Sequence, residues 1–272
     1  MKTAVVGIIA GCLSLLSPLA SGQVRSSTPA QTISFQAVSA TQIFVLGSDE
    51  KLWLELAPFG TVQPKRKQVD VGVRSFQALG AGSTFVLRTD GTLWRETGPF
   101  GPSTTRVEVD GQVQSFQALS ATQALVLGSD GKLWLEQAPF GTVPPARIEV
   151  DGSVQGFQAM SATEVYVVGT DGKLWLEQAP FGTVPPARAQ VDGSVQAFQA
   201  LSTTEAVVLG TNGKLWLEQA PWGTVPPSRA QVDGTVQAFN ACPPARSTCW
   251  DRTANCGWSR RRSARSRHLV RR

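Results

Sequence analysis

Residues 157–197 read FQAMSATEVYVVGTDGKLWLEQAPFGTVPPARAQVDGSVQA, and close copies of this stretch recur along most of the chain. Its first residue has equivalents at spacings of 40 or 41 residues, namely Phe35, Phe76, Phe116, Phe157, Phe198 and Phe239. The second unit, residues 76–115, diverges most, with Arg88, Arg95 and the loop TGPFGPST. A repeat of this period has to be explained before any single element is assigned.

Four short segments of the quoted unit have the alternation and the β-branched or aromatic residues of strands. We predict strands at residues 154–160, 164–168, 173–178 and 188–191. Asp171-Gly172 suits a tight hairpin turn, because both residue types tolerate a positive φ angle. Pro180 to Pro186 cannot lie in a central strand and must form a loop. In the third strand, the period of two places Leu174 and Leu176 on one face and Trp175 and Glu177 on the other.

Four antiparallel strands in about 41 residues are typical of one blade of a β-propeller. We therefore predict an all-β chain with a β-propeller array over residues 31–241, containing five complete blades. The competing fold is the β-trefoil, which also has a four-stranded repeat near forty residues. Trefoils require multiples of three units, and the layout of a hairpin followed by a loop fits a blade better.

The N-terminus has the pattern of an export signal. Lys2 precedes an apolar run over residues 4–20, and the small residues Ser21 and Gly22 follow it. This indicates a signal peptide at 1–22, a linker at 23–30, and a secreted, cell-surface or periplasmic protein without a membrane span after signal removal. One alternative is a lipid anchor at Cys12, since residues 9–12 resemble a bacterial lipobox. A retained membrane anchor is the other, although Gly7, Gly11 and Pro18 weaken it.

The repeat pattern stops after Ala241. Residues 242–272 hold 9 Arg, 3 of the 4 Cys and the single His. The ordinary interpretation of such a segment is a solvated basic tail that interacts with a nucleic acid or a membrane. Back-translation of residues 242–268 shifted by one base reads LSASTEHVLGPDGKLWLEQAPFGTVPP, a near copy of the other units. Two of every three bases are largely fixed by the residues present. We therefore interpret residues 242–272 as a frameshifted sixth repeat, and we expect this segment to be disordered.

The composition excludes several classes of function. The 272 residues include 25 Lys plus Arg and 20 Asp plus Glu, but residues 23–240 hold 15 basic and 19 acidic residues. The basic excess therefore lies in the tail, and nucleic-acid binding loses its support. Residues 23–241 contain no Cys and no His, no phosphate-binding glycine loop, and too few carboxylates per turn for calcium. We expect neither an enzyme nor a bound cofactor or metal.

The V-L-G-x-D-G-K-L-W core of each unit, together with the F-Q-A strand, resembles the tachylectin and tectonin repeats of β-propeller lectins. The similarity covers residues 31–240. It implies an extracytoplasmic lectin with one sugar pocket per blade or blade interface, whose partners are glycans or glycoconjugates on a cell surface. Equivalent sites on one array would raise avidity without strengthening any single site.

Three recurring side chains are candidates for ligand contact, and each has a structural alternative. The strand tryptophans stack on a sugar or pack between blades, the loop aromatics are exposed or plug the blades, and the arginine after the loop donates to sugar hydroxyls or pairs with the strand glutamate. The tryptophans are Trp53, Trp94, Trp134, Trp175 and Trp216, and the loop aromatics are Phe59, Phe100, Phe140, Phe181 and Trp222. The arginines are Arg66, Arg106, Arg147, Arg188 and Arg229.

The leading interpretation is thus a secreted, multivalent carbohydrate-binding propeller. The alternative is a non-catalytic propeller that serves as a structural or protein-interaction scaffold. Saturable and sugar-competable binding on a glycan array would separate the two.

Overall fold

The computed structural model describes residues 30–60, 65–142, 146–182, 187–224 and 226–236. The predicted signal peptide at 1–22, all but the last residue of the linker, and the tail at 242–272 lie outside the described residues. The same is true of the predicted strand around Phe239, the first strand of a sixth unit.

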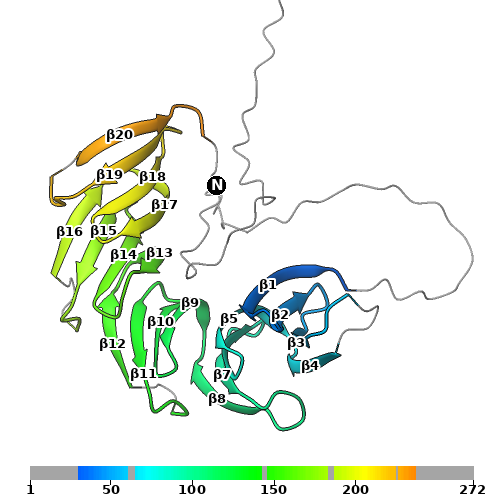
Figure 1. Cartoon of the computed structure of the whole chain (residues 1–272). Helices are drawn as coiled ribbons and strands as arrows, with labels where there is room; N and C mark the ends of the chain where they lie inside the picture. The colour runs from blue at the N-terminus through cyan, green and yellow to red at the C-terminus, as the bar shows by residue number, and fades with distance from the viewer. Residues whose placement is uncertain (1–29, 61–64, 143–145, 183–186, 225, 237–272) are drawn as a thin grey trace, which may run out of the picture. The chain divides into compact units, whose positions relative to one another are not determined.

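The described chain is all-β and forms five antiparallel sheets of four strands each (Figure 1). The first sheet contains β1 (Thr32–Ser39), β2 (Gln42–Gly47), β3 (Leu52–Leu56) and β4 (Lys65–Asp70), and the second contains β5 (Val73–Gly80), β6 (Ser83–Arg88), β7 (Leu93–Thr97) and β8 (Thr105–Asp110). The third contains β9 (Val113–Ser120), β10 (Gln123–Gly128), β11 (Leu133–Gln137) and β12 (Ala146–Asp151). The fourth contains β13 (Val154–Ala159), β14 (Glu164–Gly169), β15 (Leu174–Gln178) and β16 (Ala187–Asp192), and the fifth contains β17 (Val195–Ser202), β18 (Glu205–Gly210), β19 (Leu215–Gln219) and β20 (Ser228–Asp233).

The four strands predicted in the quoted unit are confirmed, because β13 to β16 coincide with them to within about a residue at most ends. Their spatial order is their sequence order, the simple meander of a blade. At the hairpin turn, Asp171 Oδ1 accepts the backbone N–H of Lys173 at 3.1 Å, and Gly172 has a φ angle of 77°. The recurrence of Asp-Gly is therefore explained by the turn itself, which needs the side-chain acceptor of Asp and the positive φ angle of Gly. Among the described residues, no helix is long and apolar enough to cross a membrane.

The described chain divides by its contacts into two units. One contains the first and second sheets together with the loop that starts at Phe140, and the other contains the third to fifth sheets. Within each unit the apolar core lies between successive sheets. Leu174 and Leu176 of β15, for example, pack with Val195 and Ala200 of the next sheet. The predicted division of β15 into two faces is therefore correct.

The glutamine of the F-Q-A motif joins one sheet to the next. Gln158 Nε2 donates to the carbonyl of Ala200 at 2.9 Å, and the backbone N–H of Ala200 donates to Gln158 Oε1 at 2.9 Å. Gln117 makes the same pair of bonds to Ala159. Gln36 makes them to Ala78. The repeated motif thus completes the hydrogen bonding of a backbone position on the following sheet.

Gln158→Ala should lower the free energy of unfolding by about 1–3 kcal/mol, because it leaves the partly buried N–H and carbonyl of Ala200 unpaired. The matched control is Gln155→Ala on the same strand, where the glutamine is exposed and the expected change is within about 0.5 kcal/mol. Denaturant unfolding followed by circular dichroism measures both. Equal effects at the two positions would contradict the linking role of Gln158.

Candidate functional site

A tryptophan and an arginine lie in contact on each sheet. In the fourth sheet the guanidinium carbon of Arg188 lies 4.2 Å from the centroid of the Trp175 ring, within the range of a cation–π contact. The distance is 4.1 to 4.3 Å in the first, third and fifth sheets, for the pairs Arg66–Trp53, Arg147–Trp134 and Arg229–Trp216. The second sheet differs, since Arg106 lies 5.8 Å from the Trp94 centroid and Arg88 lies 5.4 Å from it. All five tryptophans are partly buried.

The same arginine also contacts two carboxyl groups from consecutive sheets. Arg188 Nη1 lies 3.7 Å from Glu177 Oε1 of its own sheet and 3.5 Å from Asp151 Oδ2 at the end of β12. Glu177 is fully buried, and its carboxyl oxygens have no hydrogen-bond partner within the described part of the chain. Burial and the neighbouring Asp151 carboxylate raise the pKa of Glu177 to about 9, against the opposing effect of Arg188.

The fifth sheet repeats this arrangement. Arg229 Nη1 lies 3.8 Å from both Glu218 Oε1 and Asp192 Oδ2. Glu218 is fully buried, and burial together with Asp192 raises its pKa to about 8. Contacts between the arginine and the strand glutamate also occur for Arg66 (4.0 Å from Glu55) and Arg147 (3.8 Å from Glu136). The structural alternative for the arginines is therefore observed in four sheets.

A pocket of about 340 Å³ opens beside Trp175. It lies between the end of the third sheet and the β14–β15 hairpin of the fourth, and it is lined by Asp151, Ser153, Gly169, Thr170, Asp171, Trp175 and Arg188. Its volume is at the lower end of the range of small-molecule sites. The lining combines an aromatic ring, a guanidinium, two carboxylates and two hydroxyls.

The polar groups of this pocket are only partly engaged by the protein. Within the described chain, the indole N–H of Trp175 has no hydrogen-bond partner, whereas Trp94 Nε1 donates to Thr92 Oγ1 at 2.7 Å. Lys173 occupies the position of Thr92, and its Nζ lies 3.2 Å from Asp171 Oδ2 at the rim. Donors and acceptors thus surround a space of suitable size for one sugar ring.

Four of the five loop aromatics do not project into solvent but pack against the preceding sheet. Phe100 contacts Phe44 edge-on, with ring centroids 5.5 Å apart, and Phe140 contacts Phe85 at 6.0 Å. Phe181 packs on the cluster between the third and fourth sheets, and Trp222 contacts Tyr166 at 6.4 Å. Phe59 is different, with 42% of its surface exposed.

The P-[FW]-G sequence explains this placement. After the aromatic ring, the backbone N–H of Gly182 donates to the carbonyl of Glu149 on the preceding sheet at 3.0 Å, and Gly223 does the same to Gln190 at 2.9 Å. Gly182 has a φ angle of 106°, a conformation that glycine adopts without strain. Phe59 belongs to the first sheet, which follows no other sheet in the described chain, and its ring accordingly stays exposed. The alternative that these rings are plugs therefore holds for Phe100, Phe140, Phe181 and Trp222.

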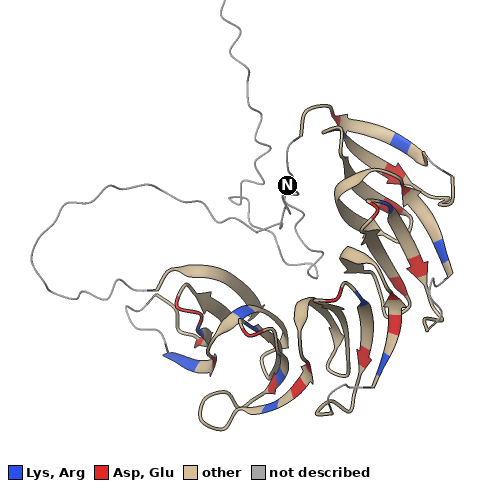
Figure 2. Ribbon diagram, turned by 180° about the vertical axis from the view of Figure 1, so that it is seen from behind, with Lys and Arg blue, Asp and Glu red and all other residues tan. Residues whose placement is uncertain are grey.

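The sequence prediction found Trp175 and Arg188 but missed Asp151, Ser153, Gly169 and Thr170. Asp151 and Ser153 belong to the preceding unit of the repeat, so no spacing within one unit joins them to the tryptophan, whereas Gly169 and Thr170 belong to the same unit as Trp175 and sequence reasoning assigned their segment to the hairpin turn alone. The sequence feature that could have indicated this site is the aspartate that ends the fourth strand of each sheet. Charged residues occupy a small part of the ribbon (Figure 2), which makes a recurring group of one arginine and two carboxyls informative.

Comparison with known proteins identifies only the fold class of this protein. No protein-family model and no curated protein matches the chain. The N-terminal domain of Nup159 matches with a TM-score of 0.51 and 10% identity, over 72% of this chain and 59% of that one. Human WBSCR16 matches with a TM-score of 0.44 and 11% identity, over 71% and 65%. The chain thus spans less than two thirds of either structure. The N-terminal domain of Nup159 is a β-propeller, and this likeness, together with the five four-stranded sheets, places the fold of this protein in the β-propeller class.

Proposed function

We propose that this protein is a non-catalytic, secreted carbohydrate-binding propeller with equivalent pockets on successive sheets. The observation that supports it is the pocket at Trp175, where an aromatic ring, a guanidinium and hydroxyl groups of two consecutive sheets line one space. Sugars present both apolar C–H faces and hydroxyls, so a mixed lining of this kind suits them. The leader-like segment 1–22 supports export, and glycans of a cell surface are the ligands we propose.

The residues of the fifth sheet support the proposal that the protein has more than one binding site. Its residues Asp192, Ser194, Gly210, Thr211, Asn212, Trp216 and Arg229 repeat the lining of the Trp175 pocket, with asparagine in place of one aspartate. The contacts of Arg229 with Trp216, Asp192 and Glu218 match those in the fourth sheet to within about 0.3 Å. Repeated weak sites then combine through avidity.

The test is a glycan array probed with the full chain and with matched tryptophan variants. Trp175→Ala should weaken the signal in part, and the double variant Trp175→Ala/Trp216→Ala should reduce it about tenfold or more, since two sites are lost. Trp94→Ala is the control, because the space beside Trp94 is filled by the protein itself. Each variant is checked by its melting temperature.

A sugar-competable signal that falls in the double variant and persists in Trp94→Ala supports the proposal. A folded protein that gives no signal across a broad array refutes it and favours the scaffold function. Equal losses in all three variants would place the binding elsewhere on the protein.

A further inference from the structure

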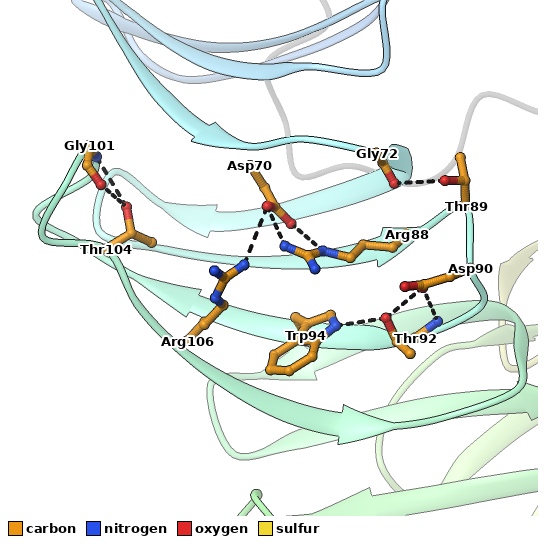
Figure 3. Close-up of polar contacts among 10 residues, drawn as sticks. All are labelled: Asp70, Gly72, Arg88, Thr89, Asp90, Thr92, Trp94, Gly101, Thr104 and Arg106. Atoms are coloured by element: carbon orange, nitrogen blue, oxygen red, sulfur yellow. Dashed lines mark hydrogen bonds and ion pairs between the residues drawn. The ribbon is translucent and has the colours of Figure 1, made fainter.

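The second sheet contains an arginine where the other sheets contain a glycine. Arg88 occupies the last position of β6, and its equivalents are Gly47, Gly128, Gly169 and Gly210. Its Nε donates to Asp70 Oδ2 at 2.7 Å while its Nη2 donates to the other oxygen of the same carboxylate (Figure 3). This bidentate geometry is the strongest form of an arginine–carboxylate contact.

Arg88 lies in the second-sheet counterpart of the Trp175 pocket. The repeat aligns the pocket residues Asp151, Ser153, Gly169, Thr170, Asp171, Trp175 and Arg188 with Asp70, Gly72, Arg88, Thr89, Asp90, Trp94 and Arg106. Figure 3 shows the Arg88 side chain reaching from its strand to Asp70, in the region of Trp94 and Arg106. The protein therefore displays, on one sheet, a cationic group bound in a space that is open on another.

The pockets of the second and fourth sheets differ in the number of cationic side chains that contact the aspartate at the end of the preceding sheet, which is Asp70 or Asp151. Asp70 contacts two guanidinium groups, those of Arg88 and Arg106, and the second lies 3.6 Å away. Among the residues that the structure describes, Asp151 contacts one guanidinium group, that of Arg188 at 3.5 Å. Lys173 does not replace the missing cation, because its Nζ pairs with Asp171 at the rim and lies 6.0 Å from the Trp175 centroid.

We propose that the pockets beside Trp175 and Trp216 bind a cationic group of the ligand, a guanidinium or a primary ammonium, at the carboxylates of Asp151 and Asp192. The bound group takes the position that Arg88 takes in the second sheet. The cation site itself does not depend on the proposed function. Combined with that function, it makes the ligand a sugar with a free amino group, and this step rests on carbohydrate binding.

Isothermal titration of the full chain with three small probes tests the proposal. Agmatine carries a guanidinium on a short aliphatic chain, D-glucosamine carries an ammonium on a sugar, and N-acetyl-D-glucosamine is its neutral counterpart. Agmatine and glucosamine should bind, and N-acetylglucosamine at least about tenfold more weakly, because the charge-assisted hydrogen bond is lost. Asp151→Asn/Asp192→Asn should weaken agmatine binding by about tenfold or more.

A second pair of variants leaves both carboxylates intact. Gly169→Arg/Gly210→Arg copies the second sheet and should abolish binding, whereas Arg88→Gly should add one site to the stoichiometry. A Cβ at Gly169 would lie 2.7 Å from Asp171 Oδ1, but the equivalent turn in the second sheet holds an arginine and still keeps the Asp90–Thr92 bond at 2.9 Å. The melting temperature reports whether each variant is folded.

The outcomes separate the two proposals. Binding of agmatine without any sugar supports the cation site and refutes the carbohydrate function. Equal binding of glucosamine and its neutral counterpart refutes the cation site and leaves the carbohydrate function standing. Failure of agmatine to bind, or unchanged agmatine binding in the arginine variants, refutes the cation site.

Discussion

Phe100→Ala should lower the free energy of unfolding by about 3–5 kcal/mol, the usual loss when a buried phenylalanine is truncated. The ring is 5% exposed and packs edge-on against Phe44 in the cluster between the first and second sheets. Its removal takes apolar surface from that cluster and leaves a cavity that the rigid strands on either side cannot close. Denaturant unfolding monitored by tryptophan fluorescence measures the loss.

The chain supplies a matched control at the equivalent loop position. Phe59 belongs to the same P-F-G sequence and is 42% exposed, so Phe59→Ala should change the stability by less than about 1 kcal/mol. Similar losses at both positions would show that the loop aromatic is not a plug between sheets. Loss of sugar binding in Phe59→Ala alone would instead make that ring a ligand contact, as the resemblance to lectins implies.

The stability of the protein should fall as the pH rises from about 5 to about 8. Burial is the largest cause that raises the pKa of Glu177 to about 9 and of Glu96 and Glu218 to about 8. In the unfolded chain these groups ionise near pH 4.3. Between these values the unfolded state loses protons that the folded state keeps, so rising pH favours unfolding, by up to about 1.4 kcal/mol per pH unit and group.

Glu177→Gln/Glu218→Gln should reduce this slope, because an amide carries no titrating proton. The double variant should gain stability relative to the natural chain at pH 8, and the difference should shrink toward pH 5. Glu164→Gln, at a partly exposed position of the fourth sheet, is the control, and it should change the slope much less than the double variant does. Melting temperatures at half-unit pH steps measure the slopes, and a natural chain whose stability rises through this range would contradict the expectation.

Both sets of predictions follow from contacts between consecutive sheets. The plug aromatic Phe100 and the group around the buried Glu177 have partners on the preceding sheet, and the linking glutamine Gln158 has its partner on the following sheet. A substitution in one repeat therefore affects the interface between two consecutive sheets. Trp222 shows the same principle, since its ring packs on Tyr166 of the preceding sheet while its Nε1 donates to the carbonyl of Thr203 in its own sheet at 2.9 Å.

The amino-acid sequence alone determined the elements of this protein. The 41-residue period, the alternation around Trp175 and the Asp171-Gly172 turn predict the sheets, their strand order and the two faces of the third strand. These features depend on backbone geometry within a few residues, and that geometry follows from local residue types. The sequence also indicated Trp175 and Arg188, each separately, as candidate ligand contacts, because both residues recur in every unit.

Only the tertiary structure decided which side chains meet. It placed Phe100 and Trp222 against the preceding sheet, although their loop sequence is compatible with exposure. It brought Asp151 to Arg188 and Asp70 to Arg88 across neighbouring sheets. Gly169 lines the pocket at Trp175, whereas the aligned position of the second sheet holds Arg88, whose side chain binds Asp70. Such contacts join residues of different units, and the spacing within a single unit carries no information about them.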